Sequence, residues 1–145
     1  MEQLFVSSSN KETQEIASRL AAGLDKGATI CLYGNLAAGK TTFTQGLASF
    51  FGIPRLVSPT FMIMRQYSIN SHPTIKTLYH LDLYRLNSVE EIKAFDVEEI
   101  WSDPGNLLVI EWPEKFVDIL PKQRIDVFLK AITEDEREIK IINRL

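Results

Sequence analysis

The sequence predicts an α/β fold built around a sheet that contains both parallel and antiparallel strands. Residues 28–33 form an apolar run followed by a glycine-rich turn and a helical pattern, as in a central strand that leads into a helix. A second apolar run at 107–110 predicts another buried strand. Hairpin-like pairs of strand patterns and few helices occupy the later part of the chain, which favours a mixed sheet over a fully parallel one.

The beginning of the chain predicts one strand and one helix. Residues 2–6 have the character of an edge strand. Ser9 and Glu12 have the spacing of a capping box, in which the serine begins a helix and the glutamate reaches back to it. Apolar side chains then follow at helical spacing, at Ile16, Leu20 and Leu24.

A second helix is expected directly after the glycine-rich turn. Its apolar face should end near Gly52, because Pro54 lies just beyond it and cannot continue a helix. Gly46 lies inside this helix. A glycine in a helix interior is destabilising relative to alanine unless another element packs close to it.

A hairpin and a short helix are expected in the middle of the chain. Strand patterns at 61–69 and 74–83 are joined by a turn-rich segment, which is typical of an exposed hairpin. Ser88 opens a second capping box, which predicts a short helix over 89–95.

Three strands are expected in the last third of the chain. The apolar run at 107–110 follows a turn at 103–105. An alternating pattern at 124–132 and a final strand at 137–142 are separated by a polar turn. These last two strands should therefore pair with each other.

Residues 34–41 fit the phosphate-binding loop pattern G-x-x-x-x-G-K-[ST] without a mismatch. Because the loop lies between a predicted strand and a predicted helix, its backbone N–H groups and the helix dipole would point at one phosphate site. Lys40 would reach the β- and γ-phosphates, and the Thr41 hydroxyl would ligate Mg²⁺. The sequence therefore predicts a P-loop NTPase-like three-layer fold, with a single domain over 1–145.

Composition excludes several classes of function. The net charge is −3, from 16 basic and 19 acidic residues, and no stretch is strongly basic, so we expect no binding to DNA and no direct grip on RNA. No apolar run approaches the length of a membrane span, so we expect a cytoplasmic protein without membrane association. Cys31 is the only cysteine and is expected to be a buried thiol rather than a reactive nucleophile.

Phosphate-binding loops need a second acidic group, at the end of another strand, to hold or orient Mg²⁺. Glu111 directly follows the apolar run at 107–110, which is how a central strand delivers a carboxylate. The alternative is a solvent-facing glutamate at a strand end, and we favour the metal ligand. Asp82 ends a more polar strand. It is expected either to contact the ligands of the metal rather than the metal itself, or to orient the attacking water.

For Thr60 and Trp112, the sequence allows more than one interpretation. Thr60 follows Pro59, so it either closes over the γ-phosphate as a switch segment does or belongs to a plain turn. Trp112 is either a core residue or a partner-binding residue. His72 and His80 are expected to be structural, because no Cys or His spacing indicates a zinc site.

The nucleotide is expected to be ATP. A GTP-specific protein would carry Asn-Lys-x-Asp on a late strand, whereas here Asn10-Lys11-Glu12-Thr13 precedes the loop and ends in threonine. The arginine-bearing lid of a usual small-molecule kinase has no counterpart downstream. Three functions are weighed: an accessory ATPase, a nucleotide-dependent binding module with incidental hydrolysis, and a small-molecule P-loop kinase.

Four motifs, in this order and spacing, resemble those of the TsaE (YjeE) family, the bacterial ATPases of tRNA threonylcarbamoyladenosine synthesis, over nearly the whole chain. The motifs are Gly34–Thr42, Ser58-Pro59-Thr60-Phe61, His80-Leu81-Asp82-Leu83-Tyr84-Arg85 and Glu111-Trp112-Pro113. The resemblance implies an ATPase of low intrinsic activity that binds the TsaD–TsaB heterodimer. That assembly attaches a threonylcarbamoyl group to the adenosine beside the anticodon of tRNAs that read ANN codons. ATP hydrolysis would reset the complex between turnovers, without the ATPase transferring the group or contacting tRNA directly.

The resemblance also implies residue roles. Lys40 matches the phosphate-binding lysine, and Thr41 and Glu111 match the Mg²⁺ ligands. The remaining motif positions required for activity match Thr60, Asp82 and Trp112. The implied catalytic set is Lys40, Thr60, Asp82 and Glu111. The implied ATP contacts are Asn10, Gly34, Asn35, Leu36, Ala37, Ala38, Gly39, Lys40, Thr41, Thr42 and Arg137.

The chain departs from the family pattern at three positions. Asn35 replaces an acidic residue of the loop, and Ala37 replaces a glycine. Both are variable positions of the general pattern, so nucleotide binding should survive. Alanine lacks the backbone freedom of glycine, which bears on loop flexibility and hydrolysis rate. Asp96 stands where the family has a glycine before a Glu-Glu pair, which should affect a local turn rather than the chemistry.

Overall fold

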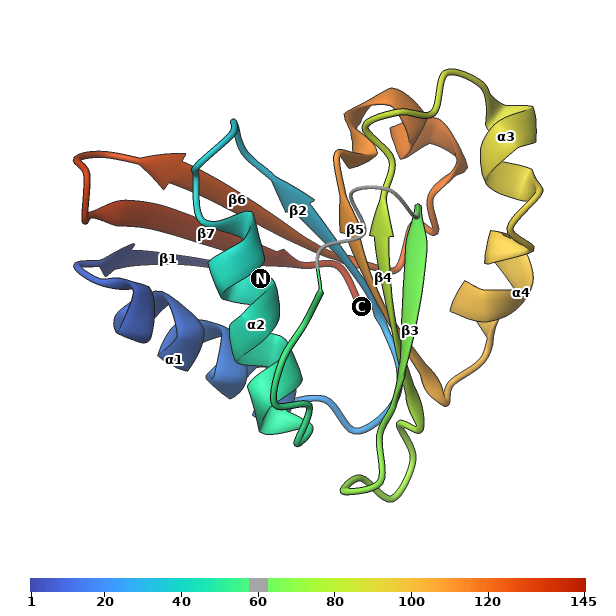
Figure 1. Ribbon diagram of the computed structural model, residues 1–145, viewed down its shortest axis with the longest axis horizontal. Helices are drawn as coiled ribbons and strands as arrows, with labels where there is room; N and C mark the ends of the chain where they lie inside the picture. The colour runs from blue at the N-terminus through green and yellow to red at the C-terminus, as the bar shows by residue number, and fades with distance from the viewer. Residues whose placement is uncertain (58–62) are drawn as a thin grey trace.

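A computed structural model describes residues 1–57 and 63–145 (Figure 1). The described strands are β1 (Glu2–Ser7), β2 (Thr29–Tyr33), β3 (Met64–Ser68), β4 (Thr77–Asp82), β5 (Asn106–Glu111), β6 (Ile125–Ala131) and β7 (Arg137–Asn143). The described helices are α1 (Asn10–Ala22), α2 (Lys40–Phe50), α3 (Val89–Lys93), α4 (Val97–Ser102) and the 3-10 helix η1 (Pro113–Ile119).

The strands form one seven-stranded mixed sheet within the described part of the chain, in the order β1-β7-β6-β2-β5-β4-β3. β6, β2, β5 and β4 pair in parallel in the middle of the sheet. The pairs β1–β7, β7–β6 and β4–β3 are antiparallel and lie toward its two sides. The predicted mixed sheet and the predicted edge strand at the N-terminus are therefore confirmed.

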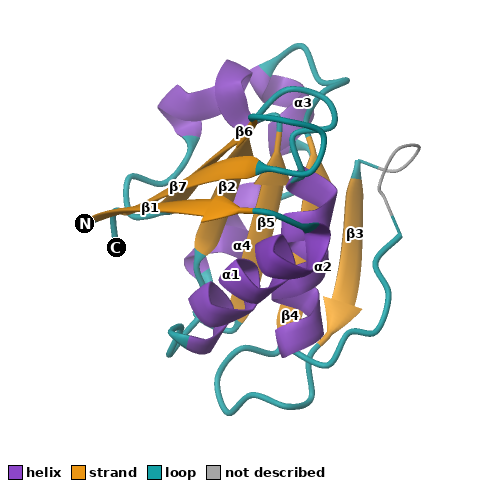
Figure 2. Ribbon diagram, turned by 90° about the vertical axis from the view of Figure 1, so that its left-hand side faces the viewer, coloured by secondary structure: helices purple, strands orange, loops and turns teal. Residues whose placement is uncertain are grey.

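Helices cover both faces of the sheet, which gives the three layers expected from the sequence. α1 and α2 pack on one face, over a core that includes Ile30, Val109 and Val127 of the central strands. α3, α4 and η1 pack on the other face, over a core that includes Cys31, Leu108 and Ile110. Figures 1 and 2 show the two helical layers on opposite sides of the parallel strands.

Most predicted elements agree with the structure to within a few residues, but α4 and η1 were not predicted. The Ser9 cap is present, since its side chain accepts a hydrogen bond from the Glu12 backbone N–H at 3.1 Å. The helix expected over 89–95 stops at Lys93, and α4 starts after Asp96, which has a left-handed φ of 53°. The left-handed turn explains why the resemblance expects a glycine at this position.

Gly46 lies where the backbone of α1 packs close against α2. A Cβ atom added to Gly46 would lie 2.5 Å from the Gln14 carbonyl oxygen and 2.9 Å from the Ala17 Cβ. Both distances are shorter than van der Waals contact, and the nearer one is to rigid helical backbone. The close approach of α1 therefore accounts for a glycine inside α2.

Gly46→Ala is expected to lower the free energy of unfolding by about 1–3 kcal/mol, the usual effect of forcing an extra carbon into a packed interior. Alanine's better helix propensity offsets only part of this loss. Urea denaturation measures the effect. Gly23→Ala is the control, because its Cβ would be 3.6 Å from the nearest atom at an ordinary φ of −82°. Equal stabilities of the two variants would contradict the proposed packing.

His72 joins the β3–β4 hairpin to the end of α1. Its Nδ1 accepts hydrogen bonds from the Thr74 and Ile75 backbone N–H groups at 3.1 and 2.9 Å. An acceptor at Nδ1 places the proton on Nε2, which donates to the Leu24 carbonyl at 3.1 Å. His72 is therefore structural, as the sequence predicted.

Cys31 is fully buried in the core beneath η1. Burial, with the Asp126 carboxylate nearby, raises the pKa of the thiol to about 12. The thiol therefore stays protonated and unreactive near neutral pH, as expected for a structural cysteine.

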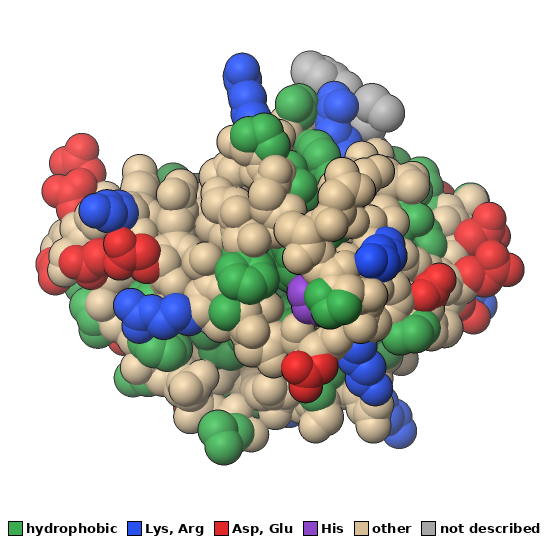
Figure 3. Space-filling model, turned by 90° about the horizontal axis from the view of Figure 1, so that it is seen from below, with side chains coloured by type: hydrophobic (Ala, Val, Ile, Leu, Met, Phe, Trp, Pro, Cys, Tyr) green, Lys and Arg blue, Asp and Glu red, His purple; other side chains and the backbone are tan. Residues whose placement is uncertain are grey.

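Charged and apolar side chains both occur on the surface. On the face of the molecule in Figure 3, acidic and basic side chains are interspersed, and apolar side chains occur in small groups. Across residues 1–57 and 63–145, no helix is long and apolar enough to cross a membrane.

Candidate nucleotide site

The glycine-rich loop at 34–39 connects β2 to α2, as the sequence predicted. A Cβ added to Gly34 would lie 2.6 Å from the Leu129 carbonyl oxygen, so only glycine lets the loop pass this close to β6. Gly39 caps α2 with a left-handed φ of 104°, and no side chain caps the helix. No side chain therefore accepts hydrogen bonds from the N–H groups of the first turn of α2. These groups are free to bind an anion.

Ala37 occupies a backbone conformation that favours glycine. Its φ is 65°, which costs a residue with a Cβ about 1–2 kcal/mol. The Arg137 side chain supports this turn, because its Nη2 donates to the Ala37 carbonyl at 3.3 Å. The loop therefore keeps a left-handed turn without the family's glycine.

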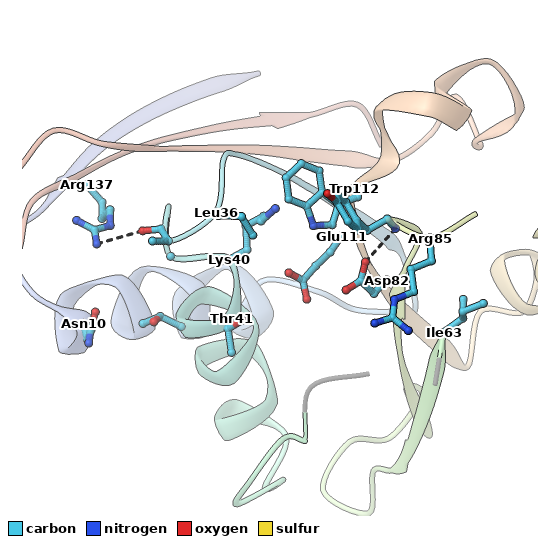
Figure 4. A pocket seen from close by; sticks show the side chains of 14 residues that line it. Asn10, Leu36, Lys40, Thr41, Ile63, Asp82, Arg85, Glu111, Trp112 and Arg137 are labelled. Atoms are coloured by element: carbon cyan, nitrogen blue, oxygen red, sulfur yellow. Dashed lines mark hydrogen bonds between the residues drawn. The ribbon is translucent and has the colours of Figure 1, made fainter. Parts of the chain in front are cut away.

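A cavity of about 510 Å³ lies over the loop and the start of α2 (Figure 4). It is lined by Asn10, Leu36, Ala37, Gly39, Lys40, Thr41, Thr42, Ile63, Asp82, Tyr84, Arg85, Glu111, Trp112 and Arg137. Most of the site residues predicted from the sequence are therefore brought together around one space. The predicted contacts Gly34, Asn35 and Ala38 belong to the loop but do not line the cavity, and Thr60 lies outside the described residues.

Lys40 is a buried positive group in the wall of this cavity. The residue is only 6% exposed, and its Nζ has no hydrogen-bond partner among the described residues. Desolvation lowers the pKa of Lys40, while the carboxylates of Glu111, Glu114 and Asp82 oppose this shift. A buried ammonium without hydrogen bonds is unfavourable, and a phosphate oxygen is the kind of acceptor that would satisfy it.

Trp112 covers Lys40 directly. The Lys40 Nζ lies 3.4 Å from the centroid of the indole ring, a cation–π contact, and the Tyr84 ring packs 5.0 Å from the same ring. Trp112 reaches this position through a left-handed backbone with a φ of 58°, which is unusual for a bulky residue. Neither of the two roles considered from the sequence, core or partner binding, included this contact.

Glu111 and Asp82 are neighbours across the parallel pair β4–β5. Register partners point to the same face of a sheet, and this face is the one that α2 covers. Figure 4 shows both side chains directed into the cavity. Glu111 is 7% exposed, so the alternative of a solvent-facing glutamate is wrong.

The two carboxylates differ in their partners. His80 Nε2 donates to Glu111 Oε2 at 2.6 Å, a contact that the sequence did not indicate. Asp82 Oδ1 accepts a hydrogen bond from the Tyr84 backbone N–H at 3.0 Å, which folds the strand end into a turn. His80 and Glu111 are both buried, so the histidine that the sequence expected to be structural lies in contact with a predicted metal ligand.

The donor set suits Mg²⁺ in a nucleotide complex. Mg²⁺ is usually held by one or two protein oxygens together with phosphate oxygens and water. A hydroxyl from Thr41 and a carboxylate from Glu111 supply such oxygens at the cavity wall. In residues 1–57 and 63–145, no cluster of three or more His, Cys, Asp or Glu side chains offers a protein-only metal site.

Asn10 and Arg137 border the cavity at the end away from Asp82 and Arg85 (Figure 4). The Arg137 Nη1 donates to the carbonyls of Thr133, Glu134 and Glu136, which fixes the guanidinium beside the loop. The cavity also includes Ile63, which the sequence did not single out, and Tyr84 and Arg85, which lie in the motif at 80–85 but were assigned no role.

β2, the glycine-rich loop and α2 follow one another, with β2 in the middle of the mixed sheet, which is the arrangement typical of α/β proteins of the P-loop type. Residues 7–139 match the family described as "Threonylcarbamoyl adenosine biosynthesis protein TsaE". The chain therefore belongs to the TsaE family.

Known proteins support this assignment. A Bacillus subtilis protein named "tRNA threonylcarbamoyladenosine biosynthesis protein TsaE" is 40% identical over 130 residues, covering 89% of this chain and 78% of the relative. A Treponema pallidum protein of the same name is 36% identical over 137 residues, covering 94% of this chain and 97% of the relative. The solved structure "Crystal structure of Bacillus subtilus YdiB" superposes with a TM-score of 0.77 at 30% identity, covering 100% of this chain and 87% of that structure.

Proposed function

We propose that this protein is a Mg²⁺-dependent ATPase that serves the synthesis of N6-threonylcarbamoyladenosine in tRNA. The observation that carries the proposal is the buried Lys40 ammonium, which has no hydrogen-bond partner in the described chain and lies at a phosphate-loop sequence. The names of its relatives give the pathway. Homologues of TsaD and TsaB are the proposed partners, and tRNA is reached only through them.

The side chains around the cavity have different roles in ATP binding and hydrolysis. The loop N–H groups and Lys40 hold the β- and γ-phosphates, and Asn10 and Arg137 border the rest of the nucleotide. Thr41 and Glu111 hold Mg²⁺, which neutralises charge on the phosphates when bound. Asp82 either orients the attacking water or contacts the ligands of the metal rather than the metal itself. Thr60, outside the described residues, is proposed to close over the γ-phosphate.

Partner-dependent turnover tests the proposal. ATP hydrolysis and tRNA modification are measured for this chain alone, for a TsaD–TsaB pair alone and for the mixture. Hydrolysis should be slow for the chain alone and faster with the pair, because hydrolysis resets the complex. The yield of modified tRNA should exceed one turnover only when this chain and ATP are both present.

The same assay separates the alternative functions. If a non-hydrolysable ATP analogue supports the full yield, the chain is a nucleotide-dependent binding module and the ATPase role is wrong. Radiolabel from γ-labelled ATP should appear in inorganic phosphate. Its appearance in a small metabolite would instead identify a kinase. A pair that changes neither turnover nor yield would contradict the proposed pathway role.

A further inference from the structure

We propose that His80 is a positioning residue that holds the Glu111 carboxylate in place for metal binding and away from Lys40. The inference rests on the proposed function of the site, because it concerns how the metal ligand is held. The contact behind it is the 2.6 Å hydrogen bond from His80 Nε2 to Glu111 Oε2. Both residues are buried, with exposures of 1% and 7%.

The sheet fixes the geometry of this pair. His80 lies in β4 opposite Val109 of β5, and Glu111 lies two residues further along β5. Residues two apart on a strand share a face, so His80 and Glu111 project on the same side of the sheet. Because β4 and β5 both have neighbours on each side, the two backbones are held by hydrogen bonds throughout.

The hydrogen bond leaves Glu111 ready to bind a cation. His80 binds Oε2, and Oε1 has no hydrogen bond or ion pair to another residue of the described chain. The imidazole Nδ1 has no hydrogen-bond partner within the described ranges, so the ring is held in this site through Nε2 alone. A ligating carboxylate that accepts a hydrogen bond from behind is the usual arrangement in metal sites.

The His80–Glu111 hydrogen bond also affects Lys40. The Glu111 carboxylate raises the pKa of the buried Lys40 ammonium, against the larger lowering by desolvation, yet the Lys40 Nζ forms no hydrogen bond with it. A direct ion pair would occupy both the phosphate-binding lysine and the metal ligand. By holding Glu111, His80 keeps the two groups separate and available.

Metal affinity tests the role of His80 without reference to turnover. Mn²⁺ is used as the probe, and its binding is followed by electron paramagnetic resonance in the presence of a non-hydrolysable ATP analogue. His80→Leu and His80→Asn should weaken Mn²⁺ binding by about 10- to 100-fold, the usual effect of losing a residue that orients a metal ligand. His80→Gln should stay close to wild type, because its amide nitrogen reaches about as far as Nε2.

The glutamine and asparagine variants make the test independent of folding defects. Both introduce an amide at the same site, but only glutamine is long enough to donate to Glu111. Binding of the analogue without metal should be unchanged in His80→Gln and weaker in His80→Asn, because the released Glu111 carboxylate can then pair with Lys40. His72→Leu is the matched control, because it removes a structural histidine away from the cavity and should leave Mn²⁺ affinity unchanged.

Three outcomes would overturn the inference. The first is wild-type Mn²⁺ affinity in folded His80→Leu or His80→Asn. The second is a glutamine variant as weak as the asparagine variant, which would show that the donor at Nε2 is not what matters. The third is a wild-type protein that binds the analogue but no Mn²⁺, in which case the proposed metal site itself is wrong.

Discussion

Lys40→Ala is expected to weaken productive nucleotide binding strongly. The variant loses a charge-assisted contact with phosphate worth roughly 1.5–3 kcal/mol, which weakens binding by about 10- to 150-fold. Hydrolysis should fall at least as much, because the same ammonium would stabilise the charge that develops on the γ-phosphate. Calorimetric titration with ATP and a phosphate-release assay measure the two effects.

Lys40→Met separates loss of charge from loss of packing. Methionine keeps most of the aliphatic stem beneath Trp112, so the core around α2 stays filled. Both variants should fold, because the group removed is a buried ammonium without a hydrogen bond in the described chain. A Lys40→Met protein that binds and hydrolyses ATP normally would refute the assignment of the loop.

Glu111→Gln is expected to leave the fold intact and to weaken Mg²⁺-dependent hydrolysis strongly. The amide oxygen still accepts the hydrogen bond from His80, so the local structure is kept. The negative charge that binds Mg²⁺ is lost. The fall in turnover should be at least as large as the about 10- to 100-fold loss typical of residues that only orient metal ligands. Turnover measured over a range of Mg²⁺ concentrations should show a weaker apparent metal affinity.

Asp82→Asn is the matched comparison, since it neutralises the register partner of Glu111. Its amide oxygen still accepts from the Tyr84 N–H, so the turn after β4 is retained. We expect a smaller change in apparent Mg²⁺ affinity and a loss confined mainly to the rate. A larger loss of metal affinity in Asp82→Asn than in Glu111→Gln would show that the two roles are reversed.

Local patterns explain why most of the fold was predictable. The capping box at Ser9, the apolar strand before the loop and the hairpin at 61–83 each depend on residues close in sequence. α4 was missed because it is only six residues long and begins after the left-handed Asp96 rather than at a recognisable cap. η1 was missed because a 3-10 helix has no strong periodic pattern.

Contacts across the sheet explain what the sequence could not predict about the site. The loop motif identified Lys40 and Thr41, and the strand pattern identified Glu111. The His80–Glu111 hydrogen bond depends on the register of β4 against β5, which no local pattern specifies. Trp112 over Lys40 likewise depends on a left-handed turn at the end of β5.

Ala37 stands where the family pattern has glycine, and the structure shows the backbone conformation of this residue. Ala37 adopts a left-handed conformation that glycine would adopt without strain, with support from Arg137. The alanine therefore does not prevent a left-handed turn in the loop. Arg137, proposed for nucleotide contact, also has this structural role.

Equilibrium dialysis of the wild-type protein against radiolabelled ATP, with Mg²⁺ or with EDTA, measures whether this cavity is a nucleotide site. Saturable binding of one ATP per chain is expected, tighter with Mg²⁺ than with EDTA and resistant to displacement by equimolar GTP. Absence of saturable binding at millimolar ATP, or full displacement by GTP, would contradict the assignment of an ATP site.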